Sequence, residues 1–235
     1  MAYQGYLISY TEGPLDSAPL NKQKHLDKDD YDESIYDFNL FVTDIMELRK
    51  ELNTKQALAG VNISNYEILT PIHKTEFLAV LDFVQPGFEK YRHDQIRVLQ
   101  SLGIKTIQLE GWYKIEEIRR IYSQASAFFL SFPETFGLPI AECLACGAYI
   151  FSPDSSWPMS WRLDKNLVSM GPGQLPDCFQ IYQDEADLRL KLSVLLKAFN
   201  PLQTANSVFN IYTKHYNHFY AGNQQGIQYL LDQLN

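Results

Sequence analysis

Residues 127–152 read AFFLSFPETFGLPIAECLACGAYIFS, two apolar segments with a short helix candidate between them. AFFLSF (127–132) and AYIFS (148–152) have the near-continuous apolar character of strands that are buried on both faces of a sheet. Between them, Pro139 suits the first position of a helix and Gly147 suits the residue just past its end. The stretch therefore predicts a strand–helix–strand unit with parallel strands.

The same alternation extends outward along the chain. FLAVLDF (77–83) and IKTIQLE (104–110) are two further apolar strand candidates. A helix with one apolar face is predicted over 115–125, and another opens at Asp184. Strands that alternate with amphipathic helices indicate a doubly wound parallel sheet, so the predicted fold class is α/β and Rossmann-like.

The first 70 residues are less regular. YLISYT (6–11) and FNLFVT (38–43) are strand candidates, and Asp44 with Glu47 forms a capping-box pattern that predicts a helix start. Residues 21–34 are highly charged without apolar periodicity, which predicts a loop.

The bulk composition excludes several classes of protein. A net charge of −8 argues against a nucleic-acid partner. No apolar run approaches the roughly 20 residues of a membrane span, so no transmembrane segment is expected. Three cysteines are a sparse, odd set that is typical of a reduced compartment. We expect a cytoplasmic protein, with peripheral attachment at the inner membrane surface as the alternative.

The segment after the strand at 127–132 has the features of a ligand site. Ligands of parallel α/β sheets bind beyond the carboxyl ends of the strands, where loops lead into helix N-termini. Backbone N–H groups at 135–138 suit phosphate, and Gly137 lets the backbone approach a ligand closely. Glu134 before the helix and Glu142 within it suit vicinal hydroxyl groups. A nucleotide sugar has phosphates between two such sets of hydroxyls.

The segment ETFGLPIAECLACG (134–147) resembles the Glu-x7-Glu signature of retaining GT-B glycosyltransferases of the family 4 (group 1) type. In that family EGFGLPxxEAxAxG is typical, so this chain differs mainly at Thr135 and Cys143. The resemblance covers roughly residues 76–200, which would correspond to the C-terminal, nucleotide-sugar-binding half.

The resemblance implies roles for individual residues. Glu134 would face the donor hexose as the catalytic residue, and Glu142 would bind the ribose hydroxyls. The other implied donor-binding residues are Thr135, Phe136, Gly137 and Leu138 along the sugar and diphosphate, Gly111, Trp112 and Tyr113 against the base, and Lys90 and Arg92 in place of the family's G-R…K-G pair. No metal and no cofactor are expected, because helix amides and basic side chains neutralise the diphosphate in the family.

The resemblance also implies a division of the chain. Residues 1–70 would be the remnant of the end of an N-terminal acceptor domain or an extension, 71–200 the Rossmann-like donor domain, and 201–235 a C-terminal helical segment that packs back across the cleft. Because 1–70 is too short for an acceptor domain, we expect a fragment or a partner chain that supplies the N-terminal half.

The predicted reaction transfers a hexose from a nucleoside diphosphate sugar to a hydroxyl acceptor with retention. One alternative is a non-catalytic nucleotide-sugar-binding module or a subunit of a two-chain transferase. A second is a GT-B-shaped epimerase or phosphorylase. Neither the base, the sugar nor the acceptor follows from the sequence.

Some of these residues also have purely structural interpretations. Trp112 and Tyr113 suit packing at a strand end, and Lys90 and Arg92 suit a solvated helix surface. The tryptophans of PDSSWPMSW (153–161) either form a sugar platform or anchor a loop. The CxxC pair, Cys143 and Cys146, is predicted to pack in the core, since no second pair completes a metal site.

Overall fold

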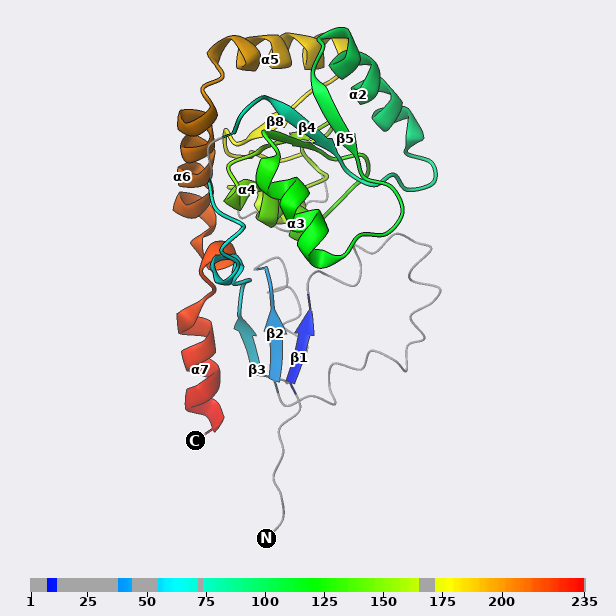
Figure 1. Cartoon of the computed structure of the whole chain (residues 1–235). Helices are drawn as coiled ribbons and strands as arrows, with labels where there is room; N and C mark the ends of the chain where they lie inside the picture. The colour runs from blue at the N-terminus through cyan, green and yellow to red at the C-terminus, as the bar shows by residue number, and fades with distance from the viewer. Residues whose placement is uncertain (1–7, 12–37, 44–54, 72–73, 165–171, 235) are drawn as a thin grey trace.

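The structure is a computed structural model of the 235-residue chain, and it describes residues 8–11, 38–43, 55–71, 74–164 and 172–234. The described residues form two parallel sheets, a larger one above a smaller one in Figure 1. The strands of the larger sheet are β4 (Leu78–Leu81), β5 (Lys105–Gln108), β6 (Ala127–Phe129), β7 (Tyr149–Ser152) and β8 (Phe179–Ile181). They are all parallel in the order β5-β4-β6-β7-β8, which confirms the predicted fold class.

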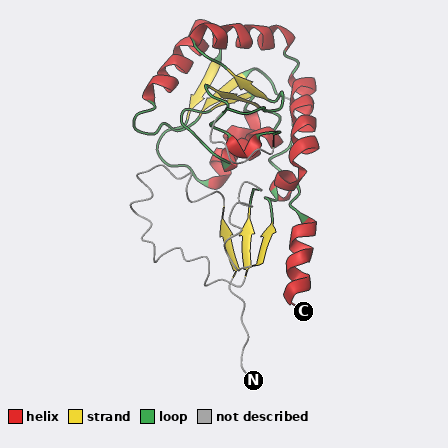
Figure 2. Cartoon of the chain, turned by 180° about the vertical axis from the view of Figure 1, so that it is seen from behind, coloured by secondary structure: helices red, strands yellow, loops and turns green. Residues whose placement is uncertain are grey.

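Helices cover both faces of the larger sheet (Figures 1 and 2). The helices packed on one face are α2 (Glu89–Ser101) and α5 (Glu185–Ala198), and those on the other are α3 (Ile115–Gln124), α4 (Leu138–Ala145) and α6 (Pro201–Tyr220). Successive strand residues point to opposite faces. Phe129 packs with α2 and α5, whereas its neighbour Phe128 packs with α3, α4 and α6.

The smaller sheet contains β1 (Ile8–Thr11), β2 (Phe38–Phe41) and β3 (Lys55–Leu58), parallel and in that order. The strand predictions at 6–11 and 38–43 are confirmed over 8–11 and 38–41, and β3 was missed because KQAL is too polar to be identified as a strand. The predicted helix start at Asp44 and the loop at 21–34 lie outside the described residues.

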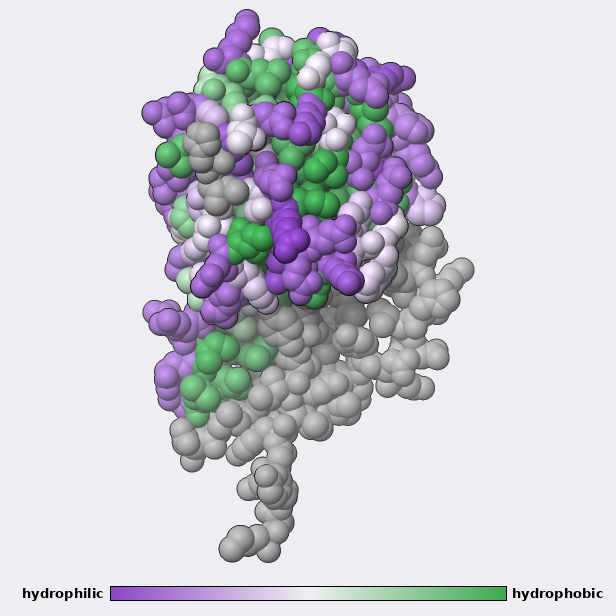
Figure 3. Space-filling view, in the orientation of Figure 1, coloured by the Kyte–Doolittle hydropathy of each residue, from purple (hydrophilic) through white to green (hydrophobic). Residues whose placement is uncertain are grey.

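The C-terminal helices run along one side of both sheets (Figure 1). Helix α6 packs on α4, and α7 (Gln224–Leu234) packs on β3. Asn223 Nδ2 donates a hydrogen bond to the carbonyl oxygen of Leu58 at 2.9 Å. Hydrophobic residues gather where α7 lies (Figure 3), and Ile227 and Leu231 are exposed there. The assignment of 1–70, 71–200 and 201–235 to separate functional parts stays a prediction.

Most of the other predicted boundaries agree with the structure. The helix expected over 115–125 spans 115–124, and Asp184 caps α5 by accepting hydrogen bonds from the amides of Ala186 and Asp187. Strand β8, only three residues long, was missed. Short 3₁₀ turns lie at η4 (Ile63–Asn65) and η5 (Met159–Trp161). Within the part of the chain that the structure describes, no helix is long and apolar enough to cross a membrane.

Candidate functional site

The strand order creates a topological switch point between β4 and β6. From β4 the chain passes through α2 to β5 on one side, and from β5 it returns through α3 to β6 on the other. Leu81 and Phe129 are register partners, so the loops that follow β4 and β6 leave the sheet side by side. Ligands of open α/β sheets bind at this point. The loop after β6 contains Glu134.

Gly137 sits where the loop after β6 enters α4. It has φ +64°, and a Cβ atom there would lie 2.5 Å from Cγ of Glu134 and 3.0 Å from Ile140. A side chain at 137 would therefore meet both a left-handed backbone and the stem of Glu134. Gly137 is the N-cap residue of α4 and has no side chain to cap the helix, and Pro139 lies in the first turn. Gly147, at φ +76°, follows its end, as predicted.

Aromatic packing holds this loop on the side that faces the core. Phe136 is buried and stacks on Trp161 with ring centroids 5.6 Å apart. The indole Nε1 of Trp161 donates to the carbonyl oxygen of Phe136 at 2.6 Å, and the Ser160 amide donates to that of Thr135 at 2.9 Å. Phe136 thus faces the core, so a ligand contact of this residue would run through its backbone.

Both tryptophans of the segment 153–161 are buried anchors. Trp161 packs among aromatic residues of α6, including Tyr212, Tyr216 and Phe219. Trp157 packs edge-on against Phe88 and Tyr91, at the start of α2. The loop-anchor interpretation is therefore the one observed.

The two glutamates of the motif lie in different environments. Glu142 is 4% exposed, and Arg119 Nε donates to its Oε1 at 2.8 Å. The guanidinium of Arg119 lies 3.6 Å from the centroid of the Tyr66 ring. Burial raises the pKa of Glu142, and the hydrogen bond and charge of Arg119 act against that rise. Glu134 is half-buried in the loop.

Asp82, which directly follows β4, is a carboxylate that the sequence interpretation missed. It is 3% exposed, and its Oδ1 accepts a hydrogen bond from the Phe83 amide at 2.8 Å. The pKa of Asp82 is raised to about 7, mainly by burial; the charge of Glu134 adds to the rise, while the hydrogen bond from the Phe83 amide and the charge of Arg92 act against it. Asp82 and Glu134 are therefore close enough to interact electrostatically.

The structure separates the two basic residues that were expected at the diphosphate. Arg92 is buried, and its Nη1 donates to the carbonyl oxygens of Asp82 at 2.9 Å and Leu109 at 3.1 Å. Lys90 is exposed and pairs with Asp94 one turn along α2, at 2.5 Å. Arg92 thus joins the ends of β4 and β5, and Lys90 lies on the outer face of α2. A diphosphate contact of either residue stays a prediction.

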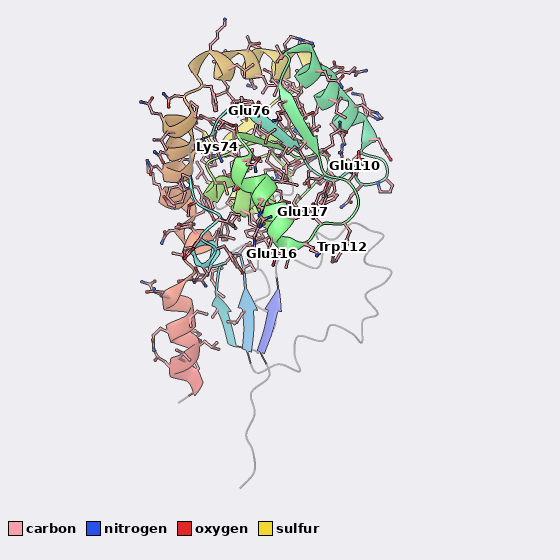
Figure 4. All side chains as sticks on the ribbon, viewed as in Figure 1. Lys74, Glu76, Glu110, Trp112, Glu116 and Glu117 are labelled. Atoms are coloured by element: carbon pink, nitrogen blue, oxygen red, sulfur yellow. The ribbon has the colours of Figure 1, made fainter. Side chains whose placement is uncertain are left out.

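The turn expected to lie against the base carries one exposed and one packed aromatic ring. Gly111 has φ +71°. Trp112 is 91% exposed and projects from the loop that leads to α3 (Figure 4). Tyr113 packs against Phe83 with ring centroids 6.0 Å apart, and its hydroxyl accepts a hydrogen bond from the Glu110 amide at 3.3 Å. Of these two rings, that of Trp112 is the exposed one and is open to stacking by a ligand or a partner.

Two cavities lie outside the motif. One of 280 Å³ lies between the start of α2 and the start of α5, and its lining includes Lys90, Tyr91 and Tyr182. The other, of 580 Å³, lies between residues 59–62 and the start of α7. Neither is lined by Glu134 or Glu142.

Sequence signals for the missed residues are uneven. Asp82 had one, since an acidic residue directly after a buried parallel strand lies at the ligand edge of the sheet. Arg119 and Tyr66 had none, because they come close to Glu142 only through the packing of α3, α4 and the segment after β3.

The buried Cys143 and Cys146 are free thiols whose pKa values burial raises, as expected of core residues.

The described residues contain no group of three or more His, Cys, Asp or Glu side chains arranged to hold a metal ion. The expectation that neither a metal nor a cofactor takes part stays a prediction.

No protein-family profile and no curated protein matches this sequence. Among solved structures, the chain is similar to the C-terminal domain of the glycosyl transferase group 1 family protein LpcC from Francisella tularensis, with a TM-score of 0.42 and 12% identity over 67% of this chain and 98% of that chain. It is also similar to the pneumococcal O-GlcNAc transferase GtfA in complex with UDP and GlcNAc, with a TM-score of 0.48 and 13% identity over 84% of this chain.

A third similar structure is the Glycosylation Associate Protein (Gap123) complex from Streptococcus agalactiae, with a TM-score of 0.45 and 7% identity over 92% of this chain. The chain spans 44% of the matched GtfA chain and 49% of the matched Gap123 chain. At these identities and scores, the likeness is a general one of fold.

Proposed function

We propose that this chain is the donor-binding half of a retaining GT-B glycosyltransferase, which transfers a hexose from a nucleoside diphosphate sugar to a hydroxyl acceptor. The observation that carries the proposal is the position of the Glu-x7-Glu segment. It leaves the sheet at the switch point between β4 and β6 and leads into the N-terminus of α4, where the N-cap residue Gly137 has no side chain.

Each part of this segment suits one part of a nucleotide sugar. The N-terminal end of α4 carries the positive end of the helix dipole and suits the diphosphate. Glu142, one turn into α4, would accept hydrogen bonds from the ribose hydroxyls. Glu134, at the mouth of the loop, would face the hexose, where positive charge develops as the glycosidic bond to the diphosphate breaks.

The charges around the segment favour a site that is completed by another part of the enzyme. A departing diphosphate gains negative charge, and the site must supply positive charge to stabilise it. At the switch point the described cation is Arg92, whose Nη1 is already bonded to two carbonyl oxygens. The acceptor half, supplied by further sequence or by a partner chain, would therefore contribute basic groups.

A second candidate is a non-catalytic donor-binding subunit of a two-chain transferase. It is favoured by Asp82, a buried carboxylate that interacts with Glu134 at the place where diphosphate would need positive charge. Ionised, Asp82 would oppose the additional negative charge that the diphosphate gains as it departs, so this chain would bind a donor without turning it over alone.

Titration of the chain with UDP, GDP, ADP and dTDP by calorimetry and thermal unfolding tests the proposal. We expect one of them to bind, and a ligand at 100 times its Kd stabilises the fold by about 2.7 kcal/mol. Glu142→Ala should abolish this stabilisation, whereas Glu116→Ala, on the exposed surface of α3, should preserve it. Absence of binding by all four nucleotides to folded wild-type protein would overturn the proposal.

Transfer separates the two candidates. A donor sugar with the nucleotide that binds would be incubated with this chain, with and without an extract of its source cells. Turnover by the chain that Glu134→Gln abolishes supports the enzyme, whereas turnover that appears only with the extract supports the subunit.

A further inference from the structure

Three side chains from separate segments meet where α3 packs against α4. Tyr66 lies in the segment that connects β3 to β4, Arg119 lies on α3, and Glu142 lies on α4. The Arg119–Glu142 pair is largely shielded from solvent, with side chains 16% and 6% exposed. One arginine is thus held by a carboxylate on one side and by the Tyr66 ring on the other.

We infer that Arg119 is a positioning residue, which holds the Glu142 carboxylate so that one oxygen faces Arg119 and the other is left for the hydroxyls of a nucleotide ribose. This inference rests on the proposed function, because it takes Glu142 as a ligand of the donor. Arg119 itself would not touch the nucleotide.

The hydrogen bonding of Glu142 supports this division. A carboxylate has two oxygens and about four lone-pair sites. Among the described residues, the bond from Arg119 Nε to Oε1 is the single side-chain hydrogen bond of Glu142. Oε2 therefore keeps its capacity to accept hydrogen bonds. A fixed Oε1 also limits rotation of the carboxylate, so less conformational freedom is lost when a diol binds.

Charge gives Arg119 a second effect on Glu142. Burial alone raises the pKa of Glu142 and favours its protonated form, which is a weaker acceptor for a diol. Arg119 acts against this rise. The other titratable groups that interact with Glu142 are Tyr122 on α3, Cys143 and Cys146 on α4 and Tyr212 on α6, all with pKa values raised by burial. Tyr122, Cys143, Cys146 and Tyr212 are neutral near pH 7, so Arg119 is the cation that acts against the raised pKa of Glu142.

Tyr66 connects this pair to the smaller sheet. A guanidinium over an aromatic face is attracted by the ring and is also held in plane by it. Because Tyr66 precedes β4 in the connecting segment, a shift of that segment would move Arg119 and, through it, Glu142.

The pH profile of nucleotide binding distinguishes positioning from a purely structural tie between α3 and α4. Arg119→Met removes the charge at similar length, Arg119→Lys restores the charge, and Arg120→Met is the matched control on the exposed side of α3. Affinities for UDP, GDP, ADP and dTDP would be measured between about pH 5.5 and 8.5. We expect Arg119→Met to weaken binding about tenfold at the acidic end, with partial recovery as the pH rises and Glu142 ionises. Arg119→Lys should recover part of the affinity, and Arg120→Met should match wild type.

A binding profile of Arg119→Met that matches wild type would overturn the inference, as would an equal loss of affinity at every pH.

A second experiment measures stability and does not depend on nucleotide binding. In urea unfolding, Arg119→Met should lose stability relative to wild type as pH rises above about 4.5, where Glu142 ionises in the unfolded chain but stays protonated in the folded one. Glu142→Gln added to Arg119→Met should remove that pH dependence. If wild type binds none of the nucleotides, the proposed function fails, while this experiment still decides whether Arg119 controls the charge of Glu142.

Discussion

The loops that follow β4 and β6 leave the same edge of the sheet side by side, yet they are stabilised in different ways. The loop after β6, residues 130–137, is held by a buried aromatic ring, by a hydrogen bond from the indole of Trp161 and by a backbone hydrogen bond from Ser160. The loop after β4 begins with the buried carboxylate of Asp82 and is held by the buried guanidinium of Arg92. Packing fixes the first loop, and charges removed from solvent fix the second.

This difference bears on function because the two loops would contact the same ligand. A packed loop presents its backbone at a constant position whatever the pH. A loop built on a carboxylate with a pKa of about 7 changes its charge within the neutral range. The three tests below ask whether the two loops differ in this way and whether they influence each other.

The largest expected effect comes from the packing behind the loop after β6. Trp161→Ala would remove a fully buried indole and its hydrogen bond to Phe136, and we expect a loss of about 3–5 kcal/mol in the free energy of unfolding. Urea unfolding measures it. Trp112→Ala is the matched control, because Trp112 is 91% exposed and its removal should change stability by less than about 0.5 kcal/mol. Similar losses in both variants would show that packing does not hold the loop.

The sequence predicted the elements whose structure is determined by residues close to one another in the chain. Apolar runs identified β4, β5, β6 and β7, and Pro139 with Gly147 marked the two ends of α4, because chain-neighbour residues decide burial, caps and turns. Strand β8 was missed because three residues are too few for any periodicity to show.

The charged residues of the site are brought together by contacts between distant parts of the chain. Asp82 and Glu134 are 52 positions apart in the chain and meet only because β4 and β6 are neighbours in the sheet. Lys90 and Arg92 looked like a pair in sequence, but residues two apart on a helix point in different directions. Arg92 is therefore buried at the ends of β4 and β5, while Lys90 is exposed to solvent.

The next effect concerns Asp82 in the loop after β4. Its pKa is 3.8 in the reference state and about 7 in the fold, so between these values the folded protein binds more protons than the unfolded chain. Stability therefore falls as pH rises from about 4 to 7, and the full cost, up to about 4 kcal/mol, is present above pH 7. Asp82→Asn should remove this cost and be more stable than wild type at pH 8, by roughly 2–4 kcal/mol.

Urea unfolding of Asp82→Asn and wild type at pH 5, 6, 7 and 8 tests this expectation. Asp177→Asn, at an exposed position, serves as the control and should follow wild type. If the gain of Asp82→Asn is the same at every pH, Asp82 is ionised throughout and the contrast between the two loops is lost.

The smallest effect decides whether the loops are coupled. Gly137→Ala and Gly111→Ala both place a side chain on a left-handed backbone, at φ +64° and +71°, which costs about 1 kcal/mol or somewhat more in each. Nothing lies within 4 Å of a Cβ atom at 111, whereas at 137 it would meet Glu134 Cγ at 2.5 Å. We expect Gly137→Ala to lose about 1 kcal/mol more than Gly111→Ala in urea unfolding.

Displacement of Glu134 should also change the pKa of Asp82. The charge of Glu134 helps to raise the pKa of Asp82, so a displaced Glu134 should let that pKa fall. In Gly137→Ala the loss of stability with rising pH should then end at a lower pH than in Gly111→Ala, and Glu134→Gln should give the same shift without the backbone cost. An unchanged pH dependence in both Gly137→Ala and Glu134→Gln would mean that the packed loop and the charged loop act independently. A ligand that contacts both loops would then have to set the protonation state of Asp82 by its own contacts, because the position of Glu134 would not influence the pKa of Asp82.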